Sequence, residues 1–440
     1  MTIYRIVYGS TTVNLNDGSI THFGEYTPRP PGENDETVTD QVAVMVKGSA
    51  AQIQTVIQSV NLAFEMAVQR RKTKLGYQVF VEFQPNGYST VYRAEIKSGR
   101  VELSQNLVLT SINKGYGEIA IFLEHTAWES SAEVAIPLTN GNGVDHTAVG
   151  LTVYNHNDSG AGHDNWVEIA AASIVGDRPA PVRLELRNLY TERISQIFVG
   201  NNWLCNGTQT FILEGEDASG GSTQAYAEAS GGYYQQTPSM GTSETQLLDW
   251  TVSTATLNLM RANYFRFLLH LSSTMPANTY LKLKIKAELT TIYDGPWRAM
   301  QSSLGLVNVD TIKLPPYLVD AGDLYPLHLV LYGKNVSPLA LNVDFAHLQT
   351  INSWRTYESV GYNVGQNVYL VDDNALGQMY TYGWATAGRL GNYRANGDKL
   401  VVMPGKKQYF TFSWRRDTGA APIDMTMSVK AWYRPRRMTL

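Results

Sequence analysis

One segment of the chain, Ser49 to Gly76, carries the pattern of an amphipathic helix, whereas the rest is typical of strands and loops. Ser49 and Gln52 form a capping box, in which each side chain accepts a backbone N–H that the first helical turn leaves unpaired. Apolar side chains then recur every three or four residues, at Ile53, Val56, Ile57, Val60, Phe64 and Ala67. Basic side chains in the last turn suit the negative end of a helix, and Gly76 can end it. The sequence therefore predicts a single helix whose apolar stripe must be covered by other elements.

Strand patterns surround this helix on both sides. The flanking runs Thr37–Lys47 and Tyr77–Phe83 are rich in β-branched and aromatic residues and nearly alternate in polarity. Similar runs lie at Ile3–Tyr8, Thr12–Leu15, Ile20–Tyr26, Thr90–Ile96, Arg100–Leu103 and Glu118–Leu123. We therefore predict an N-terminal β-sandwich with one packed α-helix over residues 1–130, a length that can bury its own core.

The remaining residues, 131–440, are also predicted to be mainly β. Their strand patterns are separated by turn signals at short intervals, which is typical of jelly rolls and other sandwiches. The clean alternation in Val182–Arg187 predicts a half-exposed strand. The glycine-rich stretch at about 214–245 predicts a long surface loop. Two topologies stay open: two successive lobes divided near Tyr332, or final strands that return to complete the first lobe.

Composition indicates a chain without membrane spans or disulfides. No window approaches the roughly 18 apolar residues that a membrane helix needs, and the first residues do not resemble a signal peptide. The chain has one cysteine, Cys205, so no intrachain disulfide can form. We expect the protein to stay where it is made and to gain its stability from packing or assembly.

Motifs for chemistry are missing from the sequence. It contains no phosphate-binding glycine loop, no nucleophile elbow and no paired-cysteine or His-Glu-x-x-His zinc motif. We predict no catalytic residue, no cofactor and no enzymatic activity. A polar loop between two predicted strands offers Asp158 and Asp164 as ligands for calcium, and an ordinary connecting loop is the alternative. Paired acids such as Glu214 and Asp372 leave a β-rich glycoside hydrolase as a further alternative.

Aromatic side chains give a second kind of candidate site. Sugar rings stack on the faces of Trp and Tyr, so exposed aromatic residues near glycines are candidates for contact with a glycan or a partner protein. Packing in the core is the alternative for each of them. The candidates are Tyr233, Tyr234, Trp354, Tyr357, Tyr382 and Trp384.

Four segments and the order of domains resemble one protein family. The segments are 165–169 (NWVEI), 176–186 (GDRPAPVRLEL), 402–410 (VMPGKKQYF) and 429–436 (VKAWYRPR). Together with a small N-terminal sandwich that holds one helix, they resemble the distal tail proteins of long-tailed bacteriophages. The resemblance implies a tail-tube-like N-terminal domain that assembles as a ring, a hexamer in this family. It also implies a galectin-like C-terminal region, enlarged here by an inserted loop or a second lobe.

Partners and location follow from the same resemblance. It implies a virion protein of the tail tip or baseplate, made in the host cytoplasm. Its expected neighbours are further copies of itself, tail-tube proteins and tail-tip proteins, with host surface glycans as an additional contact. DNA is expected only as cargo that passes through the lumen of the ring.

The stretch Tyr26–Glu36 is a candidate for contact between copies. It is rich in proline, ends in acidic residues and lies between two predicted strands. We interpret it as an arm that docks on the next subunit through Pro28, Pro30, Pro31 and Glu33; a stiff exposed loop is the alternative. Three classes of function are thus weighed: a virion ring component, a free carbohydrate-binding module and a glycoside hydrolase. We favour the first.

Overall fold

The computed structural model shows a mainly β protein, as predicted, with one long α-helix among the residues it describes. Those residues fall into two compact units, which are described separately below. Unit 1 comprises residues 1–134, 175–180 and 434–440, and unit 2 comprises residues 135–174 and 181–433. The domain division at residue 130 stays a prediction. The described residues are 3–29, 37–73, 75–87, 89–103, 108–109, 115–145, 150–156, 162–203, 211–253, 256, 263–288, 290–300, 303–314, 326–359, 364–375, 378–383, 386–391, 393–416 and 425–438.

The helix of unit 1, α1 (Ala50–Thr73), begins where the capping box predicts. The Ser49 N–H donates to Gln52 Oε1 over 2.8 Å, and the Gln52 N–H donates to Ser49 Oγ over 3.2 Å. Gly76 adopts a φ of 87°, a conformation that suits glycine after a helix. The predicted stripe is buried at Ile53, Val60, Phe64 and Ala67, with Val56 and Ile57 packed partly against the same core.

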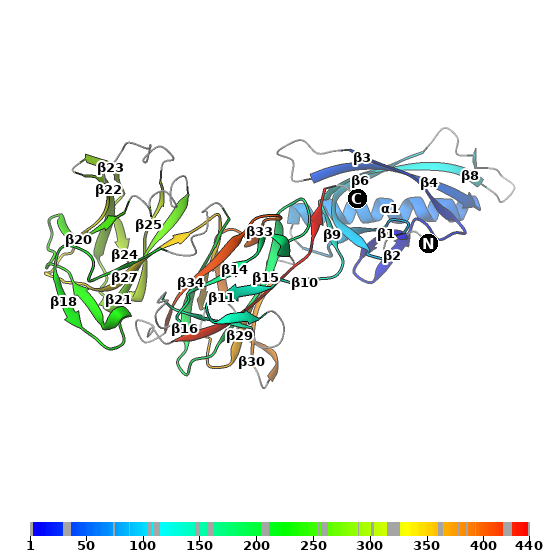
Figure 1. Ribbon diagram of the computed structural model, residues 1–440. Helices are drawn as coiled ribbons and strands as arrows, with labels where there is room; N and C mark the ends of the chain where they lie inside the picture. Colours follow the sequence, from blue (N-terminus) through cyan, green and yellow to red (C-terminus); the bar gives the residue numbers. More distant parts are fainter. Residues whose placement is uncertain are drawn as a thin grey trace. The chain divides into compact units, whose positions relative to one another are not determined.

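The strands of unit 1 form one continuous, strongly bent sheet. Its strands are β1 (Ile3–Tyr8), β2 (Thr11–Asn14), β3 (Thr21–Arg29), β4 (Thr37–Gly48), β5 (Val79–Gln84), β6 (Tyr92–Leu103), β7 (Val108–Leu109), β8 (Gly115–Thr126), β9 (Trp128–Ser130) and β36 (Arg436–Arg437). The order along the sheet is β2-β1-β5-β6-β8-β4-β3, with β9 beside β6, β36 beside β9 and β7 beside β8. Helix α1 lies against the sheet that contains β3, β4, β6 and β8 (Figure 1).

The structure corrects the predicted strands at one place in unit 1. The runs Thr90–Ile96 and Arg100–Leu103 are a single strand, β6, rather than two. A register shift between Ile96 and Ser98 bends this strand. Its first half pairs with β5 and its second half with β8, and the bend lies where the partner changes. The residues at this bend are polar, so in the sequence they resemble a turn between two strands.

One part of unit 2, here called the host lobe, is a sandwich of two sheets. Its elements are β10 (Val134–Ala135), β11 (Leu138–Asn140), β12 (Gly143–Asp145), β13 (Leu151–Tyr154), β14 (Trp166–Ile169), η1 (Ala171–Ser173), β15 (Ala180–Asn188), β16 (Ile194–Asn202), β28 (Ser353–Ser359), β29 (Val368–Asp373), β30 (Gln378–Gly383), β31 (Thr386–Gly391), β32 (Tyr393–Asn396), β33 (Val401–Val402), β34 (Gln408–Arg416) and β35 (Thr426–Tyr433). One sheet has the order β10-β35-β15-β29-β30-β31, and the other has β12-β11-β14-β34-β16-β28-β32.

The second part of unit 2, here called the inserted lobe, spans residues 211–350 and has its own core. Its elements are β17 (Phe211–Glu214), β18 (Ser222–Ala225), η2 (Ser230–Gly232), β19 (Tyr233–Gln236), β20 (Thr245–Val252), β21 (Tyr264–Met275), β22 (Thr279–Ala287), β23 (Thr290–Asp294), β24 (Arg298–Met300), β25 (Ser303–Lys313), β26 (Leu327–Lys334) and β27 (Asn342–Thr350). They form the sheets β18-β19-β27-β21-β25 and β20-β26-β22-β23. Every buried residue of the core between these sheets, from Phe211 to Leu348, belongs to the lobe itself.

The inserted lobe leaves and re-enters the host lobe between two paired strands. It follows β16 and precedes β28, which are antiparallel neighbours with Asn201 opposite Ser353. The Asn352 N–H donates to the Asn201 carbonyl over 3.0 Å and closes this point. The final strands, β34 and β35, pair with β16 and β15 of the host lobe. The final strands therefore return to the host lobe, as in the second predicted topology, but residues 211–332, which that topology placed in the same lobe, belong to the inserted lobe.

The prediction of a long surface loop at 214–245 was wrong. This stretch contains β18 and β19, which pair with each other, and β19 also pairs with β27. All four side chains of β18 are exposed, so they lack the alternation of polarity by which a half-buried strand is recognised.

Candidate assembly interface

The strands β6, β8, β4 and β3 form a four-stranded portion of the unit 1 sheet with two distinct faces. Toward α1 point the alternate residues Val42, Val44 and Ile121, which are fully buried in the core that includes Phe64. The other face points away from the helix. It carries Arg100 and Glu102 of β6, Thr39, Gln41, Ala43, Met45 and Lys47 of β4, and Tyr116, Glu118, Ala120, Phe122 and Glu124 of β8.

The outer face of this sheet has few positive charges. Its residues on these three strands include three carboxylates, Glu102, Glu118 and Glu124, but only two bases, Lys47 and Arg100. The Arg100 guanidinium lies 2.6 Å from the Glu102 carboxylate and stacks 4.5 Å from the centroid of Phe122. On β4, β6 and β8 this face is therefore close to neutral and slightly acidic.

Both outer strands of this portion have an open edge among the residues that the structure describes. The pairing of β5 with β6 ends at Glu95, so from Ile96 to Leu103 the strand β6 pairs on one side only, with β8. At the opposite end, β3 pairs with β4 alone. The start of the outer β3 edge is occupied by a local contact, because the Phe23 N–H donates to Asn16 Oδ1. Two stretches of backbone are thus available for pairing with another chain.

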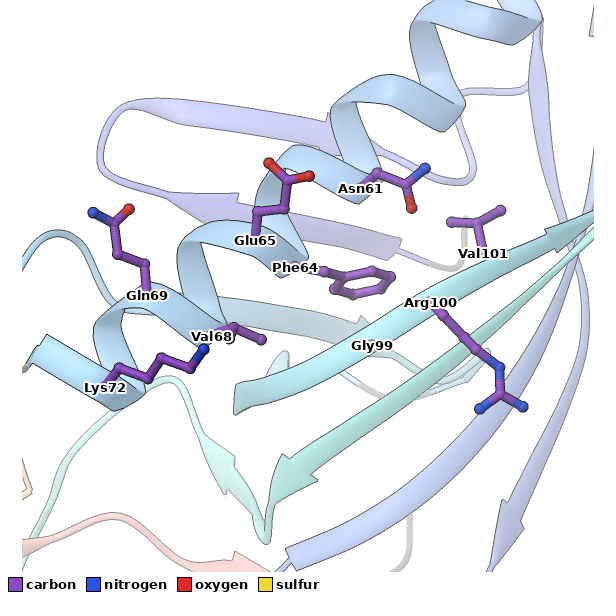
Figure 2. A pocket seen from close by; sticks show the side chains of 9 residues that line it. All are labelled: Asn61, Phe64, Glu65, Val68, Gln69, Lys72, Gly99, Arg100 and Val101. Carbon is purple, nitrogen blue, oxygen red and sulfur yellow. The ribbon is translucent and has the colours of Figure 1, made fainter.

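The open edge of β6 borders a groove of about 610 Å³ beside α1 (Figure 2). We call it the α1–β6 groove. Apolar side chains of Phe64, Val68 and Val101 line it together with polar side chains of Glu65, Lys72 and Arg100. Figure 2 shows the Phe64 ring directed from α1 toward the β6 backbone at Gly99.

Gly99 is required for this packing between helix and strand. A Cβ atom at this position would lie 2.6 Å from the Phe64 ring and 2.8 Å from the Phe122 carbonyl oxygen. Glycine therefore lets the helix approach the strand, and it does so at the point where the groove and the open edge meet.

The residues predicted for the arm lie mostly beyond the described part of the chain. Pro28 is in β3, opposite Asp40 of β4, which agrees with the confinement of proline to edge strands. Pro30, Pro31 and Glu33 are outside the described residues, as is Cys205. Their role in contacts between copies stays a prediction.

The calcium candidates are only partly described. Asp164 is 5% exposed, and its Oδ2 accepts the Gly141 N–H over 2.7 Å. Burial raises the pKa of this carboxyl group above its usual value. Asp158 is outside the described residues. Within the described ranges, no group of three or more His, Cys, Asp or Glu side chains is arranged to hold a metal ion.

Among the aromatic candidates of unit 2, the structure places four at different depths. Tyr233 is 48% exposed, and its neighbour Tyr234 is partly buried. The Trp354 ring is covered by the Arg266 guanidinium, 3.7 Å from the ring centroid. Tyr357 is fully buried, and its hydroxyl donates to Asp372 Oδ2 over 2.9 Å, so its ring has no surface on which a sugar can stack.

Trp384 lies outside the described residues, whereas Tyr382 belongs to a cluster that we call the aromatic face of the host lobe. Tyr382 stacks on Tyr369 with 4.7 Å between ring centroids, and its hydroxyl donates to Glu185 over 3.2 Å. The aromatic face consists of Arg183, Glu185, Arg187, Tyr369, Tyr380, Tyr382 and Trp432.

The aromatic face also corrects the prediction for the strand Val182–Arg187. Its polar side was expected to be open to water, but Glu185 is buried and the two arginines are half-buried. Arg183 stacks 3.8 Å from the centroid of Trp432. The sequence did not reveal this cluster, because β15, β29 and β35 are far apart in the chain and only their register brings these residues together.

Two of the acids considered for glycoside cleavage accept hydrogen bonds from neighbouring side chains. Asp372 accepts from Arg355 Nε over 3.0 Å, and burial is the main cause that raises its pKa. Glu214 accepts the Ser230 hydroxyl over 2.9 Å, while the Ser230 N–H donates to Asp344. The first contact joins residues within the host lobe, and the contacts of Ser230 join residues within the inserted lobe.

The described residues thus define a mainly β protein with one helix-backed sheet and an inserted sandwich lobe. No described helix is long and apolar enough to cross a membrane. No family model matches the chain, and no curated protein matches it.

Two solved structures are weakly similar to the chain. One is described as the phage P2 baseplate in its activated conformation with Ca, at 9% identity and a TM-score of 0.27, with 100% of both chains covered. The other is described as the same baseplate with Sr, at 10% identity and a TM-score of 0.20, with 79% of this chain and 97% of that chain covered. Likenesses this weak carry no structural or functional inference.

Proposed function

We propose that this protein is a structural component of a bacteriophage tail, located at the tail tip or baseplate. In this proposal, unit 1 assembles as a ring of identical copies that joins the tail tube to tip or adhesion proteins. The observation that carries the proposal is the pair of open edges on the β6-β8-β4-β3 portion of the sheet. Each edge leaves backbone groups that a second copy can satisfy.

The directions of the strands support closure into a ring. Each adjacent pair in the order β6-β8-β4-β3 is antiparallel, so β6 and β3 run in opposite directions. Rotation about a ring axis preserves the direction of each strand. The β6 strand of one copy therefore meets the β3 strand of the next in antiparallel orientation. The hydrogen-bond ladder thus stays antiparallel across the junction between copies. Every copy adds four strands, so each junction in the ring has the same antiparallel pairing.

The outer face of the sheet suits the wall of a channel for DNA. In the proposed ring this face lines the lumen, because the opposite face is covered by α1. A nearly neutral, slightly acidic wall does not attract phosphate groups, since binding to the DNA backbone needs clustered Lys and Arg. DNA would pass as cargo without being held. The hexameric state, the tail-tube and tail-tip partners and the virion location rest on the resemblance found in the sequence.

Association of purified chains tests the proposal through two exposed leucines of unit 1. Leu103 ends the open edge of β6 and is 59% exposed, whereas Leu75 follows α1, belongs to neither edge strand and is 74% exposed. Burial of a leucine side chain contributes about 1.5–3 kcal/mol, so Leu103→Asp should weaken association about tenfold or more. Leu75→Asp should leave it unchanged.

Sedimentation over a range of concentrations gives the measurement for both variants. Loss of the oligomer in the Leu103 variant, with an unchanged circular dichroism spectrum, is the expected result. Equal effects of the two substitutions, or a wild-type chain that stays monomeric, would contradict the proposed ring.

A second function, contact with host surface glycans, is favoured by the aromatic face. Tyr380 and Tyr382 are partly exposed, and they are flanked by the charged groups of Arg187 and Glu185. Aromatic faces and charged hydrogen-bonding groups together are typical of sugar-binding surfaces. Co-sedimentation of the chain with purified host cell walls tests this function, and absence of binding would exclude it.

A further inference from the structure

We propose that the junction between the host lobe and the inserted lobe is an acid-sensitive hinge, which releases the inserted lobe when buried histidines at the junction gain protons. The histidines are His270 of β21, His347 of β27 and His156, which follows β13 of the host lobe, and all three are buried. Both lobes belong to unit 2, so the inference does not depend on the proposed ring.

The junction between the two lobes combines a small apolar cluster with polar contacts. Phe198 of the host lobe packs with Leu268 and Leu306 of the inserted lobe. Beside them, the Gln349 side-chain amide donates to the carbonyl oxygens of Phe198 and Thr411 over 3.3 and 3.1 Å. The apolar cluster holds only three residues, so polar side chains supply much of the remaining contact.

The histidine rings occupy the same junction. His270 stacks on Phe345 with 4.0 Å between ring centroids, and the His156 ring approaches Phe345 from the host lobe at 6.3 Å. His347 Nδ1 lies 2.6 Å from Ser413 Oγ of the host lobe. The Nε2 atom of His270 is buried and has no hydrogen-bond partner among the described residues. A proton on this atom would therefore be buried without an acceptor, which is costly.

The surrounding charged groups do not offer the histidines a free counter-charge. Glu228 of the inserted lobe lies 3.2 Å from Arg416 of the host lobe, and Glu358 accepts from Gln196. Glu214 and Asp344 both accept hydrogen bonds from Ser230, within the inserted lobe. The strand β25 presents the neutral Leu306 opposite His270. The charged or titratable groups on the elements around the rings are thus Tyr154, His163, Glu214, Glu228, Arg266, Asp344, Glu358, Arg415 and Arg416.

The bases among these groups add positive charge to the junction. The Arg266 guanidinium stacks 3.7 Å from the centroid of Trp354, and its Nη1 donates to the Thr356 hydroxyl over 2.9 Å. Arg415 lies two residues from Ser413 on β34, hence on the same face of the sheet. Protonated histidines would therefore meet like charges, which favours separation of the lobes.

The pKa shifts give the direction of the pH dependence. Burial is the main cause that lowers the pKa of His270, and it lowers the pKa of His347 from 6.5 to about 3. In separated lobes these rings face water and regain pKa values of about 6.5. As the pH falls below 6.5, the separated state binds protons that the docked state does not. The equilibrium then shifts toward separation by up to about tenfold per pH unit for each histidine.

The chain connections allow separation without unfolding. The inserted lobe has its own core and is connected to the host lobe between the paired strands β16 and β28. At that point the Asn352 N–H donates to the Asn201 carbonyl, so the outgoing and returning segments lie side by side. Both connections are thus at one place, as a hinge requires.

Pulsed electron paramagnetic resonance on the full-length chain tests the hinge. In a Cys205→Ser background, spin labels are attached at Val144→Cys in the host lobe and Val336→Cys in the inserted lobe, positions that are 63% and 73% exposed. The labelled chain is diluted into unlabelled chain, so that only distances within one copy are measured. Samples are compared at pH 7.5 and 4.5, with circular dichroism in parallel. The double variant His270→Gln/His347→Gln removes two proton acceptors, and His22→Gln in unit 1 is the control.

We expect a narrow distance distribution at pH 7.5 and a broader or longer one at pH 4.5, with an unchanged circular dichroism spectrum. The double variant should stay narrow at pH 4.5, whereas the His22 variant should behave like the wild type. Identical wild-type distributions at both pH values, or equal opening in the double variant, would overturn the hinge.

The wild-type titration decides the question if the double variant is already open at pH 7.5. Opening at a higher pH than the loss of secondary structure supports the hinge. Opening that coincides with the loss of secondary structure would overturn it.

Discussion

At the scale of single residues, Gly99 is the position at which the fold of unit 1 depends most on the absence of a side chain. Gly99→Ala places a methyl group against the Phe64 ring and the Phe122 carbonyl. We expect this substitution to lower the free energy of unfolding by about 1–3 kcal/mol, as overpacking typically does. Gly241 is a control, because a Cβ atom there meets nothing within 4 Å, and Gly241→Ala should change stability by less than about 0.5 kcal/mol. Urea unfolding measures both, and equal effects would contradict this role of Gly99.

Buried histidines give unit 2 a predictable dependence on pH. Burial lowers the pKa of His347 from its ordinary 6.5 to about 3, and burial is also the main cause that lowers the pKa of His270. Between pH 6.5 and 3 the unfolded chain therefore binds a proton at His347 that the folded chain does not. The free energy of unfolding should fall as the pH falls, by about 1.4 kcal/mol per pH unit for each such histidine.

The variant His347→Gln isolates this contribution. Glutamine can keep a hydrogen bond to Ser413, whose hydroxyl lies 2.6 Å from His347 Nδ1. Burial raises the pKa of Asp344, which gives an opposite slope, but this group is present in both proteins. Unfolding between pH 4.5 and 6.5 should show a shallower slope for the variant than for the wild type. Parallel slopes would show that His347 gains its proton in the folded state.

At the scale of elements, local patterns predicted well and long-range relations did not. The start of α1 could be predicted from Ser49 and Gln52, which lie three residues apart. Most strands could be predicted from the alternation of polar and apolar residues along a single segment. The bend in β6 and the short strand β18 escaped prediction, because the first is imposed by different neighbours on its two halves and the second has no buried side.

The candidate site shows the same difference between local features, which the sequence can predict, and contacts formed only in the tertiary structure. The predicted arm lies mostly outside the described residues and stays a prediction, whereas the α1–β6 groove was not predicted, because Phe64 and Gly99 meet only in the tertiary structure. The aromatic face is a similar case. Tyr382 was selected as an aromatic residue near glycine, while Tyr369 and Trp432 join it through the register of β15 with β29 and β35. That register cannot be predicted from the spacing of residues or from the composition of the sequence.

At the scale of the whole molecule, the inserted lobe accounts for the length of the chain beyond one small sandwich. Excision of residues 203–351 leaves Asn202 and Asn352 as a two-residue turn between the paired strands β16 and β28. Because the lobe has its own core, we expect the shortened chain to fold cooperatively. Its melting temperature should fall by several degrees, since Phe198 loses its buried contacts with Leu268 and Leu306. Circular dichroism measures this, and a non-cooperative melt would contradict the independence of the lobes.

The central claim is that the open edges of β6 and β3 are completed by further copies of the same chain. Electron microscopy of the purified wild-type chain at micromolar concentration is the most direct measurement. We predict class averages of a closed ring with rotational symmetry, in which one continuous barrel surrounds the axis. Single particles of monomer mass at every concentration, with the β6 edge protected from hydrogen exchange by its own chain, would contradict the claim.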